Sequence, residues 1–215
     1  MGQVQAASSS SDLNHSTRAW RLVVAGYSMA AAGLVVFLTI NGGSGTPLVA
    51  TIGAAVLIII GLFLPAAGTL QLRRNLRTTE GAARRGYAMQ AFGLLGLLFG
   101  VVLVVEVSSL SGLFISAAFV VASGVSAITG AFLLRRHHTG AQEANDRGVA
   151  YLILGTAVIY SGVGIIVGSN IAFEYLLSQV EETIYVDGGA TLSACGCVLT
   201  AYSFFVLHPR LRSKS

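Results

Sequence analysis

The chain has 215 residues, of which 54% are hydrophobic and only 10% are charged. This is too little polar surface to cover a soluble globule of that size, so the composition excludes an ordinary soluble domain and assigns the chain to a lipid bilayer. The formal net charge of +4 raises the question of a nucleic-acid partner. The basic residues, however, lie in short segments between apolar runs, which argues against nucleic-acid binding.

The first 17 residues are rich in Ser, Gln and Ala, and no apolar run begins before Leu22. They therefore lack the hydrophobic region of a secretory signal. Their composition predicts a disordered tail over residues 1–17.

Six apolar segments follow, each with about the 20 residues that a helix needs to cross the hydrocarbon core of a bilayer. They are residues 20–40, 47–72, 86–105, 110–134, 148–168 and 188–207. The predicted fold is all-α, a polytopic membrane protein with six transmembrane helices.

The linkers between these segments alternate in charge. Residues 41–46 and 106–109 contain no Lys or Arg, whereas residues 73–85 and 135–147 are polar and basic. If the chain crosses the membrane six times, every Lys and Arg falls on one side and only acidic residues on the other. The excess of positive charge predicts that this side, with both termini, is cytoplasmic.

One sequence unit recurs three times. Residues that match at an offset of 60 are Gly26 and Gly86, Tyr27 and Tyr87, and Gly33 and Gly93. Residues that match at an offset of 62 are Gly86 and Gly148, Gly93 and Gly155, and Gly100 and Gly162. The repeat predicts three consecutive helical hairpins at residues 18–80, 81–142 and 143–209, with a cytoplasmic C-terminal tail at 210–215.

Small residues four apart are expected to bring these helices together, because close packing replaces the hydrophobic effect inside a bilayer. The pairs are Gly96 and Gly100, Ser126 and Gly130, Gly164 and Gly168, and Ser193 and Cys197. We expect them to pack within the chain. Gln90, near the cytoplasmic end of its span, is expected to bond to a neighbouring helix.

The linker after the fifth span departs from the other outer turns. Its apolar residues recur at helical spacing between positions 170 and 184, with acidic residues mostly on the opposite side. This pattern predicts a short amphipathic helix that lies on the outer leaflet or docks on a partner. The alternative is a helix that caps the end of the bundle. The candidate partner-binding residues are Phe173, Glu174, Leu176, Leu177, Glu181 and Glu182.

No residues suited to catalysis, cofactor binding or metal binding gather in the predicted spans. The four His residues fall in the tail, a loop or a terminus, so haem ligation within the membrane is not expected. Cys195 and Cys197 are two apart on a predicted helix and therefore point in different directions. We expect no catalytic residue, no cofactor and no metal site, and hence no enzyme.

The basic linkers suit anionic lipid headgroups, towards which each Lys or Arg contributes about 1 kcal/mol near a charged membrane surface. The candidate lipid contacts are Arg73, Arg74, Arg77, Arg84, Arg85, Arg135 and Arg136. The same residues are also explained by membrane orientation alone.

Three consecutive hairpins with short outer turns and Arg-rich inner loops resemble the HdeD family of bacterial acid-resistance membrane proteins. Two local patterns add to the resemblance: Ser44-Gly45 with Thr51, Gly53-Ala54, Leu57-Ile58 and Gly61 in the second span, and Gly112-Leu113-Phe114 with Ala117-Ala118-Phe119 in the fourth. The acidic linker at 170–187 departs from the family pattern. The resemblance implies a prokaryotic cytoplasmic membrane, a role in acid stress and no catalytic residues.

The sequence therefore predicts a non-catalytic integral membrane protein with a structural, accessory or stress-protective role, as a subunit of a larger membrane complex if the outer helix binds a partner. Its expected partners are membrane lipids and other membrane proteins or further copies of itself. The alternative is a small channel or transporter whose path runs between the three hairpins and is lined by hydroxyls and backbone.

Overall fold

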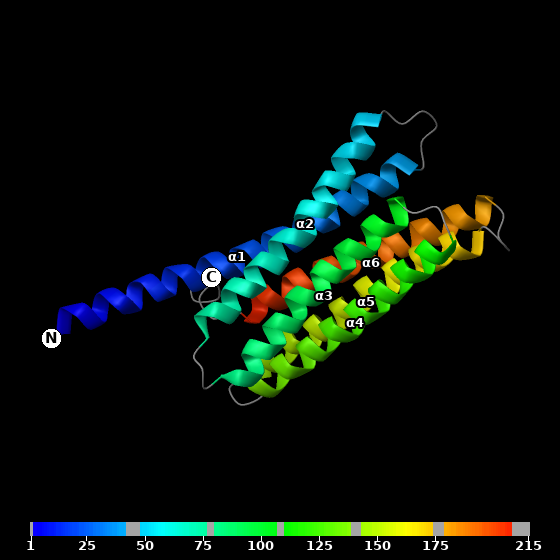
Figure 1. Ribbon diagram of the computed structural model, residues 1–215. Helices are drawn as coiled ribbons and strands as arrows, with labels where there is room; N and C mark the ends of the chain where they lie inside the picture. The colour runs from blue at the N-terminus through cyan, green and yellow to red at the C-terminus, as the bar shows by residue number, and fades with distance from the viewer. Residues whose placement is uncertain are drawn as a thin grey trace.

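The computed structural model describes the backbone of residues 2–41, 48–76, 80–106, 110–138, 143–173 and 179–207. This part of the chain contains six long helices and is all-α, as the sequence predicts (Figure 1). The helices are α1 (Gly2–Asn41), α2 (Leu48–Asn75), α3 (Gly81–Glu106), α4 (Leu110–His138), α5 (Glu143–Phe173) and α6 (Gln179–Leu207).

Each helix contains a stretch that is long and apolar enough to cross a membrane. The six stretches have 23 to 28 residues: Thr17–Ile40, Leu48–Asn75, Gly81–Leu103, Gly112–Arg135, Arg147–Ile171 and Thr183–Leu207. A helix rises about 1.5 Å per residue, so every stretch exceeds the roughly 30 Å of a hydrocarbon core. The six predicted spans are therefore confirmed as helices within a few residues of their expected ends.

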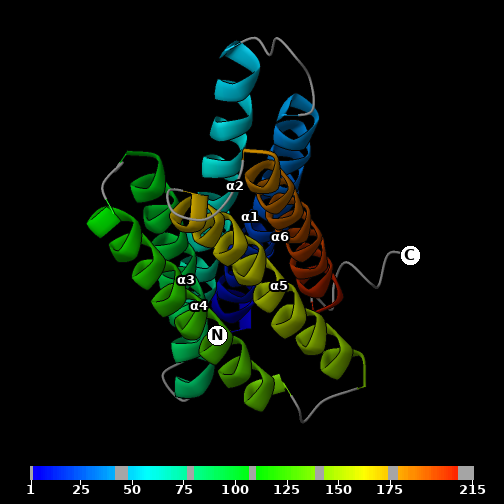
Figure 2. The ribbon, with the colours of Figure 1, turned by 90° about the vertical axis from the view of Figure 1, so that its right-hand side faces the viewer.

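Consecutive helices pair as three antiparallel hairpins, α1 with α2, α3 with α4, and α5 with α6. Weaker packing joins α2 to α3, α4 to α5 and α6 to α1, so the six helices close into a ring (Figure 2). The ring thus repeats one arrangement three times: a tight hairpin, followed by a looser contact with the next hairpin. Contact between α3 and α5 also crosses its interior.

The glycines of the sequence repeat form the seam inside each hairpin. Any side chain on them would collide with the partner helix. In the first hairpin, Gly26 faces Pro65 and Leu64, and Gly33 faces Ile58 and Leu57; in the second, Gly86 faces Gly130 and Leu134, and Gly93 faces Ala127 and Ser123. In the third, Gly148 faces Leu207, Gly155 faces Thr200 and Gly196, and Gly162 faces Gly189 and Ser193. Small residues permit this approach of two backbones, which dispersion and weak hydrogen bonds then stabilise in lipid. The threefold repeat in the sequence is therefore a threefold repeat of helix seams.

The small-residue pairs take different places. Gly96, Gly100 and Gly130 lie against the partner helix of their own hairpin, as expected. Gly164 and Gly168 do not, because a Cβ at either position would meet open space and both residues are exposed. The prediction that this pair packs within the chain is wrong. Spacing of four places two residues on one helix face without deciding whether the face meets a helix or lipid.

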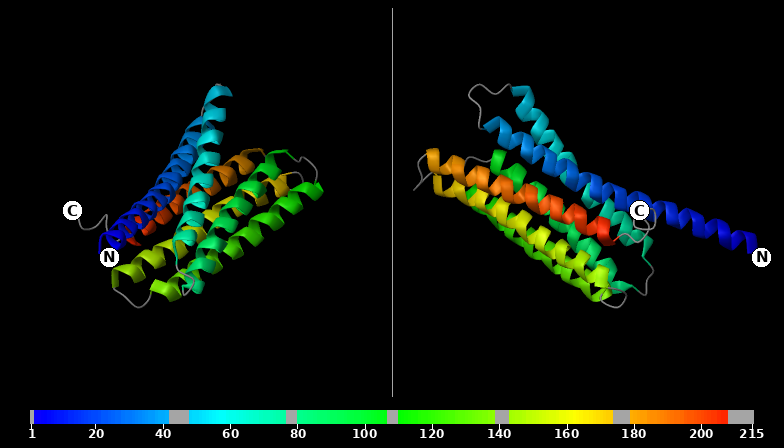
Figure 3. Two further views of the ribbon diagram at one scale, coloured as in Figure 1. Left: turned by 60° about the vertical axis from the view of Figure 1, so that its left-hand side comes forward. Right: turned by 180° about the vertical axis from the view of Figure 1, so that it is seen from behind.

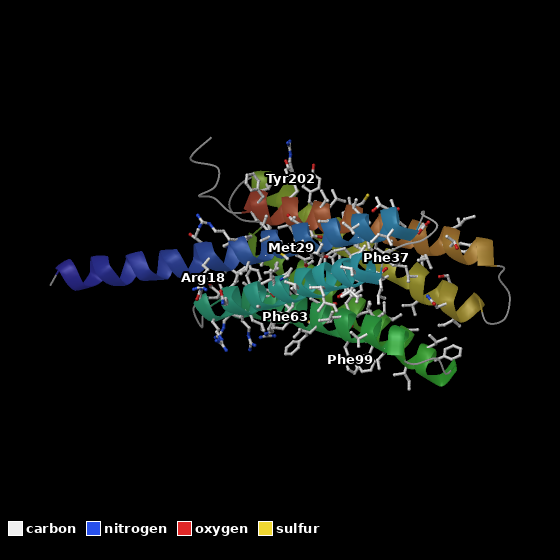
Figure 4. All side chains as sticks on the ribbon, turned by 90° about the horizontal axis from the view of Figure 1, so that it is seen from above. Arg18, Met29, Phe37, Phe63, Phe99 and Tyr202 are labelled. Atoms are coloured by element: carbon white, nitrogen blue, oxygen red, sulfur yellow. The ribbon has the colours of Figure 1, made fainter. Side chains whose placement is uncertain are left out.

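A single cluster of buried apolar side chains, drawn from all six helices, fills the middle of the ring. Its largest fully buried members include Tyr27, Leu97, Leu134, Leu152 and Phe204. The outside of the ring is equally apolar. Phe63 and Phe99 point away from the bundle in Figure 4, and they are 55% and 50% exposed. Apolar residues on both sides of each helix are what a bundle needs when lipid is its solvent.

The outer ends of α1 and α2 lean away from the other four helices (Figures 1 and 2). In agreement, Leu48 and Val49 are 74% and 79% exposed, and Ala54 is the only buried residue between positions 48 and 56. The first hairpin is therefore held to the ring mainly by its other half, which contains Leu62, Ala66 and Leu72.

Two segments differ from the sequence-based expectation. α1 is helical from Gly2 and extends beyond the bundle, where a disordered tail at 1–17 is expected (Figure 3). Residues 3–17 contain neither Pro nor Gly, so the helix of the span meets no breaker as it continues towards the N-terminus. α6 begins at Gln179 and continues without interruption to Leu207, so residues 179–184 are its first turns and not part of a separate amphipathic helix.

Candidate functional site

The predicted partner-binding residues lie at the end of the bundle where α5 ends and α6 begins. Phe173 is the last residue of α5, and Glu181 and Glu182 lie in the first turn of α6. Glu174, Leu176 and Leu177 lie outside the described residues, as do the side chains of the other three. Their use as a docking surface remains a prediction.

The candidate lipid-binding arginines lie at the opposite end of the bundle. Arg73 and Arg74 occupy the last turn of α2, and Arg84 and Arg85 the first turns of α3. Arg73, Arg74, Arg85 and Arg135 are exposed, while Arg84 is half-buried and its backbone N–H donates to the Glu80 carbonyl at 3.0 Å. Arg136 belongs to α4 with its side chain outside the described residues, which also exclude Arg77.

The two ends of the bundle therefore differ in charge among the residues described. Arg18 of α1 lies at the same end of the bundle as these arginines (Figure 4). Arg21 of α1 and Arg147 of α5 lie at this end as well. Glu106 and Asp187 lie towards the other end, in α3 and α6. The alternation of basic and non-basic linkers in the sequence thus becomes a separation of basic residues to one end.

Some polar side chains inside the spans join the two helices of a hairpin. The Gln90 side-chain amide donates to the Ala127 carbonyl at 2.7 Å, which confirms the predicted bond to a neighbouring helix. Two serine hydroxyls cross other parts of the seams: Ser126 donates to the Met89 carbonyl at 3.1 Å and Ser116 to the Gly100 carbonyl at 2.6 Å. These bonds hold the two helices of a hairpin together. The Ser193 hydroxyl donates to the Gly189 carbonyl of its own helix at 2.9 Å, and the Ile159 carbonyl of α5 lies farther away at 3.4 Å.

Most other hydroxyls in the spans bond to the preceding turn of their own helix. Thr69 donates to the carbonyls of Pro65 and Ala66, both at 2.9 Å, and Thr200 donates to the Gly196 carbonyl at 2.8 Å. This local bond satisfies a hydroxyl without a partner helix. It also means that a Thr or Ser in these spans is weak evidence for a polar path.

Two buried hydroxyls on α5 behave differently. Thr156 and Tyr160 are 3% and 8% exposed, and neither Thr156 Oγ1 nor Tyr160 Oη has a hydrogen-bond partner. They lie one helical turn apart, in the middle of the stretch Arg147–Ile171. A polar group without a partner is unfavourable in hydrocarbon, where water cannot satisfy it. Asp187 Oδ1, towards the start of α6, is the other buried side-chain atom without a partner among the residues described, so Thr156 and Tyr160 are the two found in the middle of a span.

The residues around this pair come from other helices. The ring of Tyr160 lies against Gly124 of α4, where a Cβ would come within 3.1 Å of the Tyr160 Cδ1 atom. Tyr27 of α1 is also buried, with 1% of its surface exposed. Tyr27 also stacks on Phe204, with ring centroids 6.3 Å apart. Tyr160 therefore packs against α4, and Tyr27 packs against α6.

Metal binding is not indicated in the described residues, which contain no group of three His, Cys, Asp or Glu suited to an ion. Cys195 is exposed and Cys197 is buried, and both are free thiols. They face opposite sides of α6, as their spacing of two predicts.

Comparison with protein-family models, with curated proteins and with solved structures finds no match. The chain is an integral membrane protein by its six candidate spans. Its function must therefore be argued from the arrangement of its own residues.

Sequence reasoning placed Gln90 correctly but did not single out Tyr160. A tyrosine in an apolar span resembles any other aromatic residue, so composition gives no signal. Gly124 offers a signal for the position of Tyr160. It is a glycine outside the repeated seam positions, and a small residue there indicates that another helix packs a large side chain against it.

Proposed function

We propose that this chain is a non-catalytic integral membrane protein with a structural, accessory or stress-protective role. The observation that supports this most is the use of its polar side chains. Gln90, Ser116 and Ser126 bond to carbonyls of the partner helix in their hairpin. Polar groups within a transporter are generally kept to bind or move a substrate, whereas these three stabilise the hairpin itself.

The packed interior supports the same proposal. Apolar side chains from all six helices form one buried cluster. A protein of this design acts through its outer surfaces, which are lipid-facing flanks and two ends of different charge. The end where α5 meets α6 is the proposed partner-binding end, and the arginine-rich end is the proposed site of anionic lipid contact.

The resemblance to the HdeD family adds a physiological role to this proposal. Six helices in three consecutive hairpins agree with the layout expected for that family, and the role it suggests is one in acid stress. The proposed location is a prokaryotic cytoplasmic membrane with both termini in the cytoplasm, because the arginine-rich end is then on the cytoplasmic side.

The test compares three forms of the full-length protein in cells from which the native gene has been removed: wild type, the triple variant Phe173→Ser, Leu176→Ser and Leu177→Ser, and the control variant Leu48→Ser and Val49→Ser. The control also removes apolar side chains near the outer end, at positions that are exposed in α2. We expect wild type and control to restore survival after acid challenge and to co-purify the same membrane proteins in mild detergent. The triple variant should lose both properties while it reaches the membrane at normal levels. Equal survival and equal co-purification for all three forms would contradict the proposal.

A second candidate is a small channel or transporter with a path between the hairpins. The unpartnered hydroxyls of Thr156 and Tyr160 favour it, because they place polar groups in the middle of a span. A continuous path also needs hydration on both sides of this pair, where the neighbouring buried residues Leu152 and Val163 are apolar. Solute flux into protein-containing liposomes separates the two candidates.

A further inference from the structure

Two tyrosines from the two helices of the third hairpin meet on its outer side. Tyr151 of α5 and Tyr202 of α6 pack edge to face, with ring centroids 5.4 Å apart and ring planes at 72°. Tyr202 is 51% exposed and Tyr151 is half-buried. Figure 4 shows Tyr202 towards the same end of the bundle as Arg18, on the flank opposite Phe63. The pair therefore lies where the bundle meets lipid, near its arginine-rich end.

The positions of the two tyrosines in their helices place them at the edge of the hydrocarbon core. The apolar stretches Arg147–Ile171 and Thr183–Leu207 have 25 residues each. Each is therefore about 37 Å long, several ångströms more than the roughly 30 Å of the core. Tyr151 lies one turn inside the first stretch, and Tyr202 lies just over one turn from the end of the second. This is the depth at which tyrosines are enriched in membrane proteins, because the ring is apolar and the hydroxyl is polar.

Arg147 adds a positive charge beside the tyrosine pair. It is exposed, and its spacing of four places it on the same helix face as Tyr151. A long side chain on a helix leans towards the N-terminus, which for Tyr151 is towards the turn of Arg147. A guanidinium has five N–H donors and binds phosphate oxygens through two parallel hydrogen bonds, and a tyrosine hydroxyl donates one more. These donors suit a phosphate group at the level of the lipid headgroups.

The surface that continues from the tyrosines towards the middle of the membrane is apolar. Leu154 lies three residues after Tyr151 on α5, and Val198 lies four residues before Tyr202 on α6, so each shares a face with its tyrosine. They are 52% and 57% exposed, and the thiol-bearing Cys195 one turn further along α6 is exposed as well. A free phosphate would gain nothing from this surface, whereas the acyl chain of a phospholipid packs on it. The ligand that fits both parts is an anionic phospholipid.

We propose that Arg147, Tyr151 and Tyr202 form a binding site for one anionic phospholipid on the third hairpin. The Arg147 guanidinium binds the phosphate, and the Tyr151 hydroxyl donates to the same group. The Tyr202 ring holds the Tyr151 ring in place, and an acyl chain lies over Leu154 and Val198. The inference rests on the proposed contact of this end with anionic lipid, and it locates one site there that uses none of the arginines already named as lipid contacts.

Photo-crosslinking of the full-length protein in lipid nanodiscs tests the site directly. The probe is phosphatidylglycerol with a diazirine on its acyl chain, at a concentration below saturation, and mass spectrometry of the digested protein locates the crosslinks. We expect crosslinks at Leu154 and Val198, and about fivefold lower yield there in Arg147→Gln, the change that corresponds to about 1 kcal/mol for one basic residue. Arg147→Lys keeps the charge and should retain most of the yield. The proposal is overturned if Arg147→Gln crosslinks like the wild type, or if a phosphatidylcholine probe gives the same yield at these residues.

The tyrosines are tested in the same assay by separating the hydroxyl from the ring. Tyr151→Phe should lower the yield, because it removes a donor to the phosphate. Tyr202→Phe keeps the ring and should leave the yield unchanged, whereas Tyr202→Ala should lower it. Tyr185→Phe is the control, since Tyr185 is 49% exposed near the opposite end of α6. Equal yields for Tyr151→Phe, Tyr202→Ala and Tyr185→Phe would overturn the assignment of the tyrosines.

A variant of α2 separates this site from the general contact of the arginine-rich end with anionic lipid. Replacing Arg73 and Arg74 by Gln should reduce the number of anionic lipids that the protein retains, but should not change the crosslinking yield at Leu154. If that variant loses lipids while Arg147→Gln changes nothing, the site is overturned and the general contact stands. If Arg147→Gln alone lowers the yield at Leu154, the site is supported and the contact at α2 is contradicted. Circular dichroism verifies that each variant is folded before yields are compared.

Discussion

Gly86 of α3 and Gly130 of α4 lie against each other's backbone. A Cβ at Gly86 would come within 2.9 Å of the Gly130 carbonyl oxygen, and a Cβ at Gly130 within 2.7 Å of the Gly86 carbonyl oxygen. Neither atom can shift cheaply, because both oxygens belong to helical backbone. The second hairpin therefore depends on the absence of a side chain at both positions.

Replacing Gly86 by Leu should separate α3 from α4 and destabilise the protein by about 1–3 kcal/mol, the usual range for overpacking a well-packed interface. The measurement is the midpoint of unfolding of the purified protein in mixed micelles. Gly164→Leu is the matched control, since a Cβ at Gly164 meets open space, and it should change the midpoint little. Equal losses from both variants would show that the effect does not arise from the seam.

Removal of the hydrogen bond between Gln90 and the Ala127 carbonyl should have a smaller effect. Hydrogen bonds between membrane helices contribute on average about 0.6 kcal/mol, so Gln90→Leu should lower stability by an amount of that order. Thr129→Val is the control, because Thr129 is exposed and its hydroxyl donates to Val125 of its own helix at 2.7 Å. The same unfolding assay measures both. A loss for Thr129→Val as large as that for Gln90→Leu would contradict the assigned role of Gln90.

The proposed orientation can be read from cysteine labelling in intact cells. In a variant without Cys195 and Cys197, a cysteine in place of Thr183, an exposed residue near the start of α6, should react with a membrane-impermeant maleimide. A cysteine in place of Asn75, the exposed last residue of α2, should react only after the cells are permeabilised. Reaction in the opposite order would place the arginine-rich end outside and refute the orientation.

Arg73 and Arg74, exposed in the last turn of α2, should attract anionic lipids through charge. Replacing both by Gln should reduce the number of anionic lipids retained by the protein in native mass spectrometry, because each charge contributes about 1 kcal/mol near such headgroups. Replacing both by Lys keeps the charge and should preserve retention. Retention that is unaffected by the Gln substitutions would exclude these two residues as lipid contacts.

The sequence predicts the local architecture well because its signals are local. Glycines at Gly26, Gly86 and Gly148 mark one repeated position, and each lies in the seam of its own hairpin. A hairpin joins neighbouring segments, so the repeat unit and the packing unit coincide. The periodic charge of the linkers likewise predicts the separation of basic residues to one end.

The sequence says less about how the hairpins meet. Closure of the ring by α6 and α1 joins segments at the two ends of the chain, and apolar faces that meet a helix resemble apolar faces that meet lipid. The same ambiguity explains why Gly164 and Gly168 are open although their spacing suggests a contact. It also hides the buried, unpartnered hydroxyls of Thr156 and Tyr160, which are enclosed only once α5 packs against its neighbours.

The central claim is that the polar groups of this bundle serve packing and do not line a path. The most direct test is the flux of water, protons, small ions and neutral solutes into liposomes that contain the purified wild-type protein, followed by stopped-flow light scattering and fluorescent indicators. We expect rates equal to those of protein-free liposomes for every solute. A faster rate for any of them that is abolished by Tyr160→Phe, but not by Tyr202→Phe on the exposed face of α6, would contradict the account.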